Sequence, residues 1–452
     1  MEGGQIKDFT KWNIVKQLWT IAWPIMLSIW FYTLYNLVDT FWVSKISTDA
    51  IAAVWISQVA MMVMMSLTMW VSIGSSVLMS MKIGKGDKKE AARVMGQSFA
   101  LSTIVWIIFS VLFFIFREEI LRVSGAVWDV FLPALWYFTI VALWGVLLAY
   151  LINIMMIFNA EWDTFTVTKL FAVSTFVNII LDPILIFWKF GIPSMWIHWA
   201  AYATLISQII FIVLAMRVLS SKKRKVFFSH KNISLKLHSV KKVLDIGIPA
   251  ACTQVLNPVW LAIVTYLVAQ KFMENWAAAF SLVFRLEFFA YLPAVWFSMA
   301  AMSMIGQNIW AWNIKRANEI FKKAAIMWFS TAIVLWITLI ISGNYIIGFF
   351  TDNTIVTQYS LEYLYIVAGT YGFLALSMII SATFQSTWKS WPGFWLIFIK
   401  LFLVTIPLSF VIIYYTNFDI RYIWMSLALW NFLTAIFGII WSKIYFNQLN
   451  KK

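Results

Sequence analysis

QLWTIAWPIMLSIWFYTLYNLVDTFW, residues 17–42, is long and apolar enough to cross a bilayer as one helix, since about 20 apolar residues span the hydrocarbon. Eleven further segments of similar length and composition follow. They lie roughly at 50–80, 94–116, 131–158, 164–188, 194–218, 243–270, 276–304, 324–342, 357–384, 394–415 and 420–446. With 62% hydrophobic and only 12% charged residues, the chain has too little polar surface for a water-soluble globule of 452 residues. The sequence predicts an all-α integral membrane protein with twelve transmembrane helices.

The basic residues indicate how these helices are oriented. With the N-terminus in the cytoplasm, six of the 34 Lys and Arg residues fall in external loops and three within spans, which leaves 25 in cytoplasmic segments. This is the positive-inside pattern, so we expect both termini in the cytoplasm and interpret the net charge of +15 as a topology signal. We expect no nucleic-acid partner. The first apolar segment is too long for a signal peptide, and a multi-pass protein of a prokaryotic plasma (inner) membrane is predicted.

Residues that carry catalysis or bind transition metals are scarce. Cys252 is the single cysteine, so an intramolecular disulfide or a thiolate cluster cannot form. The three histidines, His198, His230 and His238, are scattered and match no zinc or triad spacing. We therefore expect a protein that is not an enzyme and that carries no cofactor.

An internal repeat divides the chain into two halves. The polar segment 220–242 is the predicted cytoplasmic linker between an N-terminal lobe (1–219) and a C-terminal lobe (243–452), each with six spans. A shift of 226 residues places IGKGDKKEAAR (83–93) on IWAWNIKRANE (309–319), and FNAEWDT (158–164) on FQSTWKS (384–390). Halves that start on the same side form a parallel repeat, which generally places a pathway at their interface.

Each half begins with a helix that contains a proline, Pro24 or Pro249, and these correspond at a shift of 225. A proline inside a helix removes one backbone hydrogen bond and allows bending. Both prolines are candidate hinges, and a static packing kink is the alternative interpretation.

Several stretches, in order over nearly the whole chain, resemble the multidrug and toxic compound extrusion (MATE) family. They are PIMLSIWFYTLYNLVDTFWVSK (24–45), IGKGDKKEA (83–91), FNAEWDT (158–164), NIILDPILIF (178–187), WAAYATLISQ (199–208), IGQNIWAWNIKRA (305–317) and FQSTWKS (384–390). The resemblance implies two pseudo-symmetric six-helix lobes around a central cavity.

Two acidic residues lie inside predicted spans at a shared depth. Asp39 is about 20 residues into the first helix and Asp182 about 18 into the fifth, so both lie ~27 to 30 Å from the cytoplasmic face. A charged residue within a span costs about 2.5 to 3.5 kcal/mol and usually faces a cavity. The alternative is that these carboxylates reach the outer headgroups and only cap or snorkel.

Two neutral residues complete the predicted site. Asn178 shares a helical face with Asp182, and Thr204 on the returning sixth helix supplies a hydroxyl. Two carboxylates, an amide and a hydroxyl suit a Na⁺ ion or a proton, and we expect no other metal. The resemblance places all four residues at cation-binding positions of the family's N-terminal lobe. For Asn178 and Thr204 the alternative is a hydrogen bond in helix packing.

The second half lacks this pair, because the shift places Val264 near the position of Asp39 and Leu408 at that of Asp182. Ion coupling is therefore predicted for the N-terminal lobe alone. Arg285 and Glu287 are intramembrane charges that serve either a cavity or a structural ion pair. Glu161 resembles a family position, and a solvated loop carboxylate is its alternative.

The predicted function is secondary active export, in which Na⁺ or H⁺ influx drives efflux of organic cations or other amphiphilic drugs by alternating access. Aromatic and Met side chains suit flat lipophilic cations. A flippase for a lipid-linked substrate is the alternative, although Arg285, Lys169 and Lys400 are few for a phosphate-binding cavity. A membrane enzyme would need clustered catalytic residues, and a channel is disfavoured by the proline-bearing repeat. The expected partners are the small-molecule substrate and membrane lipid, around a monomer.

Tryptophan repeatedly stands where the resemblance leads us to expect glycine. These positions are Trp55, Trp70, Trp162, Trp196, Trp199, Trp310 and Trp388. Independently, the shift of 226 places Gly84 on Trp310 and Gly86 on Trp312, and the chain has 28 Trp but only 17 Gly. We hypothesise that some of these tryptophans are glycines encoded by a reassigned stop codon. The alternative is a protein that is rich in tryptophan.

Overall fold

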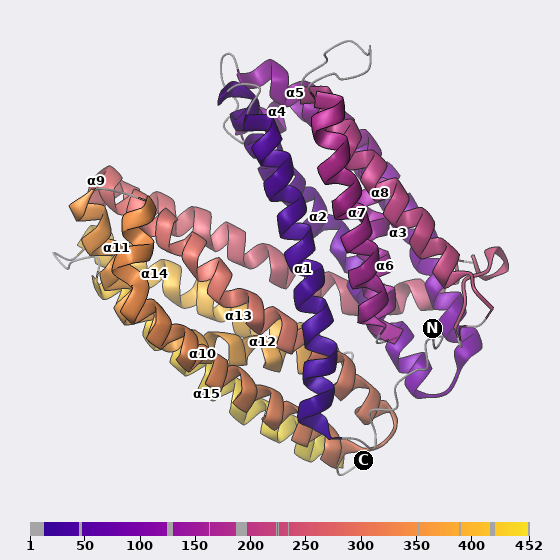
Figure 1. Cartoon of the computed structure of the whole chain (residues 1–452). Helices are drawn as coiled ribbons and strands as arrows, with labels where there is room; N and C mark the ends of the chain where they lie inside the picture. The colour runs from indigo at the N-terminus through magenta and orange to yellow at the C-terminus, as the bar shows by residue number, and fades with distance from the viewer. Residues whose placement is uncertain are drawn as a thin grey trace. The chain divides into compact units, whose positions relative to one another are not determined.

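The computed structural model describes residues 13–44, 48–123, 130–161, 163–186, 197–222, 224, 226–233, 235–350, 353–387, 390–415 and 421–450. Throughout these ranges the regular secondary structure is helical (Figure 1). The first part of the chain forms α1 (Ile14–Ser44), α2 (Thr48–Gly84), α3 (Lys88–Ile115), α4 (Arg117–Val123), α5 (Phe131–Trp144), α6 (Val146–Glu161), α7 (Thr164–Ile186) and α8 (Ile197–Leu219).

The predicted fourth span, 131–158, consists of two helices rather than one. The axes of α5 and α6 differ by 52° across a break at Gly145. At this break the core side chain of Trp106 occupies the space beside the backbone, since a Cβ at position 145 would lie 1.8 Å from its Cζ2. Glycine therefore permits a close approach that a longer side chain would prevent.

The second part of the chain begins with η2 (His230–Asn232). It continues with α9 (Leu237–Trp310), α10 (Ile314–Phe350), α11 (Thr354–Val367), η3 (Ala368–Thr370), α12 (Tyr371–Gln385), α13 (Ser390–Phe398), the π-helix η4 (Ile399–Thr405), α14 (Ile406–Tyr415) and α15 (Arg421–Asn450). The predicted spans 243–270 and 276–304 both lie within α9. No glycine or proline occurs between Pro258 and Pro293, so no residue there interrupts helical hydrogen bonding. In Figure 1 the ribbon of α9 turns back near its label.

The apolar surface of the helices fits a lipid environment. Among the described residues, nine helices are long and apolar enough to cross a membrane, and the bent pair α5 and α6 makes ten. The two remaining predicted spans, 243–270 and 276–304, lie within α9. Large apolar side chains such as Ile108 and Phe176 are more than half exposed, whereas Phe138 and Trp106 are buried in a core formed by α2, α3 and α5. Outward-facing apolar chains are what lipid requires.

The chain forms two compact units whose boundaries lie beside the two predicted hinges. One unit contains Trp23–Ala251, and the other contains the chain from Cys252 onward together with the start of α1 up to Ala22. Pro24 and Pro249 therefore each lie within about three residues of a point where the chain passes from one unit to the other.

The predicted linker, 220–242, packs against the first unit over much of its described length. Val226 and Phe228 are buried, and the ring of Phe228 lies 5.4 Å from that of Phe99 on α3. Further along, Gln97 Nε2 donates to the carbonyl of Lys236 at 3.1 Å. The linker therefore extends the first unit, and α9 begins inside the predicted linker, at Leu237.

Candidate cation site

Two threonine hydroxyls of α7 fix its register against α1. Thr168 Oγ1 donates to the carbonyl of Pro24 at 2.7 Å, and Thr175 Oγ1 donates to the carbonyl of Phe31 at 3.2 Å. Both pairs are 144 residues apart and seven residues separate them on each helix, so the helices run parallel. One further heptad places Asp182 opposite position 38, beside Asp39. The register thus brings the two predicted acids together, and their carboxyl groups interact electrostatically.

The four predicted site residues are buried within the first unit. Their exposed fractions are 3% for Asp39, 0% for Asn178, 0% for Asp182 and 7% for Thr204. Asn178 Nδ2 donates to Asp182 Oδ1 at 3.0 Å, as their spacing of four residues on one helix predicts. The structure therefore places α1 and α7 side chains in one polar cluster inside an apolar helix bundle.

Three oxygens of this cluster lack a hydrogen-bond partner among the described residues. They are Asp39 Oδ1, Asn178 Oδ1 and Asp182 Oδ2, and each is buried. Buried acceptors without donors are costly, and two neighbouring carboxylates cannot both stay charged without compensation. A proton or a small cation would satisfy both requirements. Two carboxylates and an amide offer oxygen ligands with at most two negative charges, which suit a monovalent ion.

Tyr35 belongs to this cluster, although the sequence did not single it out. It lies one helical turn before Asp39 on α1, it is buried, and its hydroxyl interacts with Thr204 on α8. It also interacts electrostatically with Asp39, Asp182 and Tyr137. The spacing of four residues from Asp39 was the available signal. A phenol between the two acids and Thr204 connects α1 to α8.

Glu161 is not a solvated carboxylate. Its side chain is 5% exposed and forms an ion pair with Arg224 of the linker, which also pairs with Asp163 at 2.9 Å. The guanidinium lies 4.9 Å from the centre of the Phe158 ring. Burial lowers the pKa of Arg224, but the two carboxylates outweigh burial and hold this pKa above its usual value. Arg224 therefore ties the linker to the end of α6 and the start of α7.

The intramembrane charges of the second unit have partners of their own. Tyr363 OH on α11 donates to Glu287 Oε2 on α9 at 2.6 Å, and Glu287 interacts electrostatically with Lys400. Lys400 is 7% exposed and lies in η4, a π-helix. The side chain of Arg285 lies outside the described residues. The contacts of Glu287 within its own unit fit the structural interpretation of this charge.

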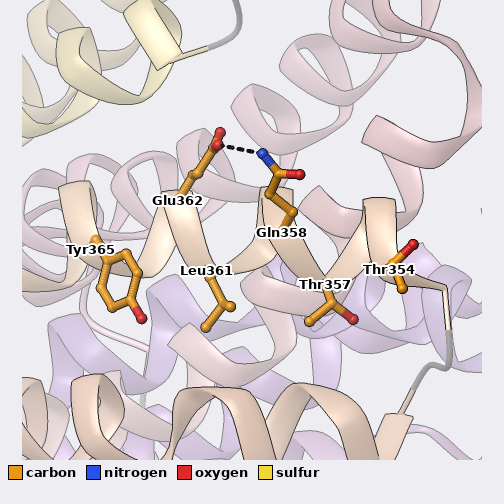
Figure 2. Close-up of a pocket in the computed structure, with 6 residues that line it drawn as sticks. All are labelled: Thr354, Thr357, Gln358, Leu361, Glu362 and Tyr365. Carbon is orange, nitrogen blue, oxygen red and sulfur yellow. Dashed lines mark hydrogen bonds between the residues drawn. The ribbon is translucent and has the colours of Figure 1, made fainter.

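A cavity of about 360 Å³ lies along one face of α11 (Figure 2). Its lining consists of Thr354, Thr357, Gln358, Leu361, Glu362 and Tyr365. Gln358 Nε2 donates to Glu362 Oε1 at 3.2 Å, and Arg421 forms two further bonds to the same carboxylate at 2.7 and 3.1 Å. The single acid of this cavity is thus already neutralised, which makes the cavity a weaker ion site than the α1–α7 cluster.

A model of the MatE family matches residues 24–184 and 249–411. The chain belongs to the MatE family. The two matched segments begin 225 residues apart and end 227 apart, which brackets the internal shift of 226. Members of this family are transporters, so the predictions of a membrane transporter and of a protein that is not an enzyme are confirmed.

Relatives and solved structures agree with this membership. The chain is 24% identical to the probable multidrug resistance protein YoeA of Bacillus subtilis over 94% of each chain. It is 25% identical to the FAD transporter of Shewanella oneidensis, over 88% of this chain and 87% of that one. A crystal structure of MATE in the bent conformation aligns with a TM-score of 0.91 at 21% identity, over 100% of this chain and 99% of that chain. The predicted twelve-helix fold is confirmed, and the protein is a multi-pass membrane protein.

Proposed function

We propose that this MatE member is a secondary active exporter in which Na⁺ or H⁺ binds at Asp39, Asn178 and Asp182 and drives efflux by alternating access. The observation that supports this proposal is the set of three buried oxygens without hydrogen-bond donors on α1 and α7. Such acceptors require a positive partner, and the interior of a membrane makes an uncompensated carboxylate costly.

The chemistry of one cycle follows from the charge of this cluster. When the site is loaded, a cation or proton neutralises the two carboxylates, so α1 and α7 pack together without repulsion. When the site is empty, the two negative charges in a medium of low polarity repel each other. Because Asp39 lies on α1, which carries Pro24, the change in charge biases the position of α1. The ion gradient thereby supplies the free energy for export.

The proposed substrates are organic cations or other amphiphilic drugs, in line with the relative named as a probable multidrug resistance protein. The relative named as an FAD transporter adds an anionic flavin dinucleotide to the compounds to be tested. The proposed location is a prokaryotic plasma membrane with both termini in the cytoplasm, because this orientation would put most of the Lys and Arg residues on the cytoplasmic side.

The test is efflux of a fluorescent organic cation from proteoliposomes under separately imposed sodium and proton gradients. We expect one of the two gradients to accelerate efflux in the wild type, and Asp39→Asn to lose this acceleration while it still inserts. Asp245→Asn, at an exposed acid near the start of α9, is the matched control and should behave as the wild type. Gradient-driven efflux that survives in Asp39→Asn would refute the proposed site.

A further inference from the structure

A pair of buried hydroxyls surrounds the carbonyl of Pro24. Ser28 on α1 is 3% exposed and Thr168 on α7 is 4% exposed. Thr168 Oγ1 lies 2.7 Å from the Pro24 carbonyl oxygen, and Ser28 Oγ lies 2.9 Å from the same oxygen. The two hydroxyl oxygens are 2.9 Å apart, and Thr168 Oγ1 is also 3.0 Å from the carbonyl of Thr164 within its own helix.

More oxygen atoms lie within hydrogen-bond distance of Ser28 and Thr168 than their two hydroxyl protons can serve at once. Each hydroxyl carries one proton, so Thr168 donates to only one of Pro24 O, Thr164 O and Ser28 Oγ at a time. In one arrangement Thr168 donates to Pro24 O and joins α7 to α1. In the other it donates to Thr164 O inside α7, while Ser28 alone serves the Pro24 carbonyl. Both arrangements leave both hydroxyls satisfied, so exchange between them costs no buried hydrogen bond.

This exchange lies at the point where α1 is weakest. Pro24 has no N–H, so the helical bond to the carbonyl of Thr20 is missing and α1 bends there most readily. The residues of α1 before Trp23 belong to the second unit, in which Gln17 bonds to Arg316 at 3.3 Å and the ring of Trp19 lies 5.2 Å from that of Phe297. The bond from Thr168 is therefore made at the first turn of α1 that belongs with α7.

We propose that Thr168 is a positioning residue for transport, which sets the bend of α1 at Pro24 by exchanging its hydrogen bond between the Pro24 and Thr164 carbonyls. Thr175 differs, because its hydroxyl donates to the Phe31 carbonyl, away from the proline. It holds the outer part of α1 against α7, so movement is confined to the turn around Pro24. The inference rests on the proposed function, because ion binding at Asp39 is what would bias the exchange.

Two substitutions isolate the hydroxyl. Thr168→Val keeps the branched shape and removes the hydrogen bond, and Thr168→Ser keeps the hydroxyl. Thr175→Val is the matched control, because it removes a bond of the same kind between the same two helices, seven residues further along. In each variant, spin labels at Thr20→Cys and Lys169→Cys, in a Cys252→Ser background, report the distance between α1 below the proline and α7 with and without the ion.

We expect two distance populations in the wild type. In Thr168→Val the lost bond joins two helices in one arrangement, whereas in the other it only returns to a carbonyl of the same helix and contributes little, so the ratio should change by roughly 3- to 10-fold. The rate of ion-driven efflux should fall by a similar factor, while the ion concentration for half-maximal efflux stays unchanged. Thr168→Ser should restore both values, and Thr175→Val should leave the ratio as in the wild type.

Two results would overturn the inference. One is a Thr168→Val protein with the wild-type ratio, and the other is a Thr175→Val protein that changes the ratio as much as Thr168→Val does. The failure of the proposed function is separable, because it appears as efflux in the wild type that responds to neither gradient. The ratio of the two distance populations is measured without substrate, so it tests the role of Thr168 independently of the efflux result.

Discussion

Two loops at repeat-related positions, one after α2 and one after α9, close with the same backbone hydrogen bonds. Gly86 N donates to Ile83 O at 2.9 Å, and at a shift of 226 Trp312 N donates to Ile309 O at 3.1 Å. The next residues, Asp87 and Asn313, each accept a bond from the backbone N–H three residues further on, at 3.1 and 3.2 Å. The repeat thus extends from sequence to the details of backbone structure.

The two loops differ at the one residue whose backbone is left-handed. Gly86 has φ of +76°, whereas Trp312 has φ of +59° and a side chain that is 80% exposed. Glycine adopts this conformation at little cost, but a side chain with a Cβ pays about 1 to 2 kcal/mol. The backbone at this point therefore favours glycine in both halves, and the second half carries an indole there at that cost.

Several buried tryptophans show a second sign of poor fit. The indole N–H groups of Trp106, Trp260, Trp296 and Trp336 are buried and have no hydrogen-bond partner among the described residues. Buried indole N–H groups usually find an acceptor. None of these four is among the positions where glycine was expected, and Trp310, which is, donates from Nε1 to the Ser386 carbonyl at 3.2 Å.

The halves also differ in charge, and the largest expected effect comes from making the first half like the second. Leu408 corresponds to Asp182, so Asp182→Leu removes the acid from the candidate site. We expect ion-driven efflux in proteoliposomes to fall to the background of protein-free vesicles, because the ion loses one of its two carboxylate ligands and the repulsion that it relieves between Asp39 and Asp182 disappears. Loss of the acceptor for Asn178 should destabilise the fold by about 1 to 3 kcal/mol.

Glu287→Gln is the matched control, because Glu287 is the intramembrane acid of the second unit. It should keep its ion-driven efflux, since the amide oxygen still accepts from Tyr363. If Glu287→Gln loses ion-driven efflux while Asp182→Leu retains it, the ion site lies in the second half and not in the first.

The next effect concerns the loops after α6 and α12. Under the shift, Glu161 corresponds to Thr387, just after α12, whose hydroxyl donates to the Phe384 carbonyl at 2.9 Å. Arg224→Ala leaves the buried Glu161 carboxylate without its cation, and we expect a loss of about 3 to 5 kcal/mol in the free energy of unfolding. Denaturant unfolding in detergent measures it.

The double variant Glu161→Thr with Arg224→Ala copies the second half and should recover most of this loss. Lys222→Ala, at an exposed basic residue of the same run, should change stability by less than about 0.5 kcal/mol. Equal losses in Lys222→Ala and Arg224→Ala would show that the ion pair contributes nothing specific.

The sequence predicted the acids of the site because carboxylates within apolar spans are rare, and it predicted the Asn178 contact because four residues separate it from Asp182. It did not predict Tyr35 or Thr168. Their roles depend on the register between α1 and α7, which is set by packing and is not visible in the periodicity of either helix. Arg224 lies in a run of four basic residues, and only the fold shows which of them reaches Glu161. The sequence predicted two spans, 243–270 and 276–304, where the structure has the single helix α9, because no glycine or proline ends a helix between them.

The smallest expected effect is at Trp312. Trp312→Gly should stabilise the protein by about 1 kcal/mol, because relief of the left-handed side chain outweighs the larger conformational entropy that glycine gives the unfolded chain. Gly86→Trp, the reverse change in the other half, should destabilise it by a similar amount. Trp136→Gly, inside the right-handed helix α5, is the control and should destabilise, since glycine costs about 1 kcal/mol there. Thermal unfolding in one detergent compares all three.

Position 312 also provides a direct test of whether the native protein has glycine or tryptophan at such positions. If the codon for Trp312 is a stop codon reassigned to glycine in the source organism, protein isolated from that organism should be lighter than the printed sequence by the difference between tryptophan and glycine at each such position. Mass spectrometry of the peptide that contains residues 309–315 measures this directly. An ordinary tryptophan codon, together with an intact indole in that peptide, would end the hypothesis. Trp312 would then be a strained residue of the second half, at a position where the first half has the unstrained Gly86.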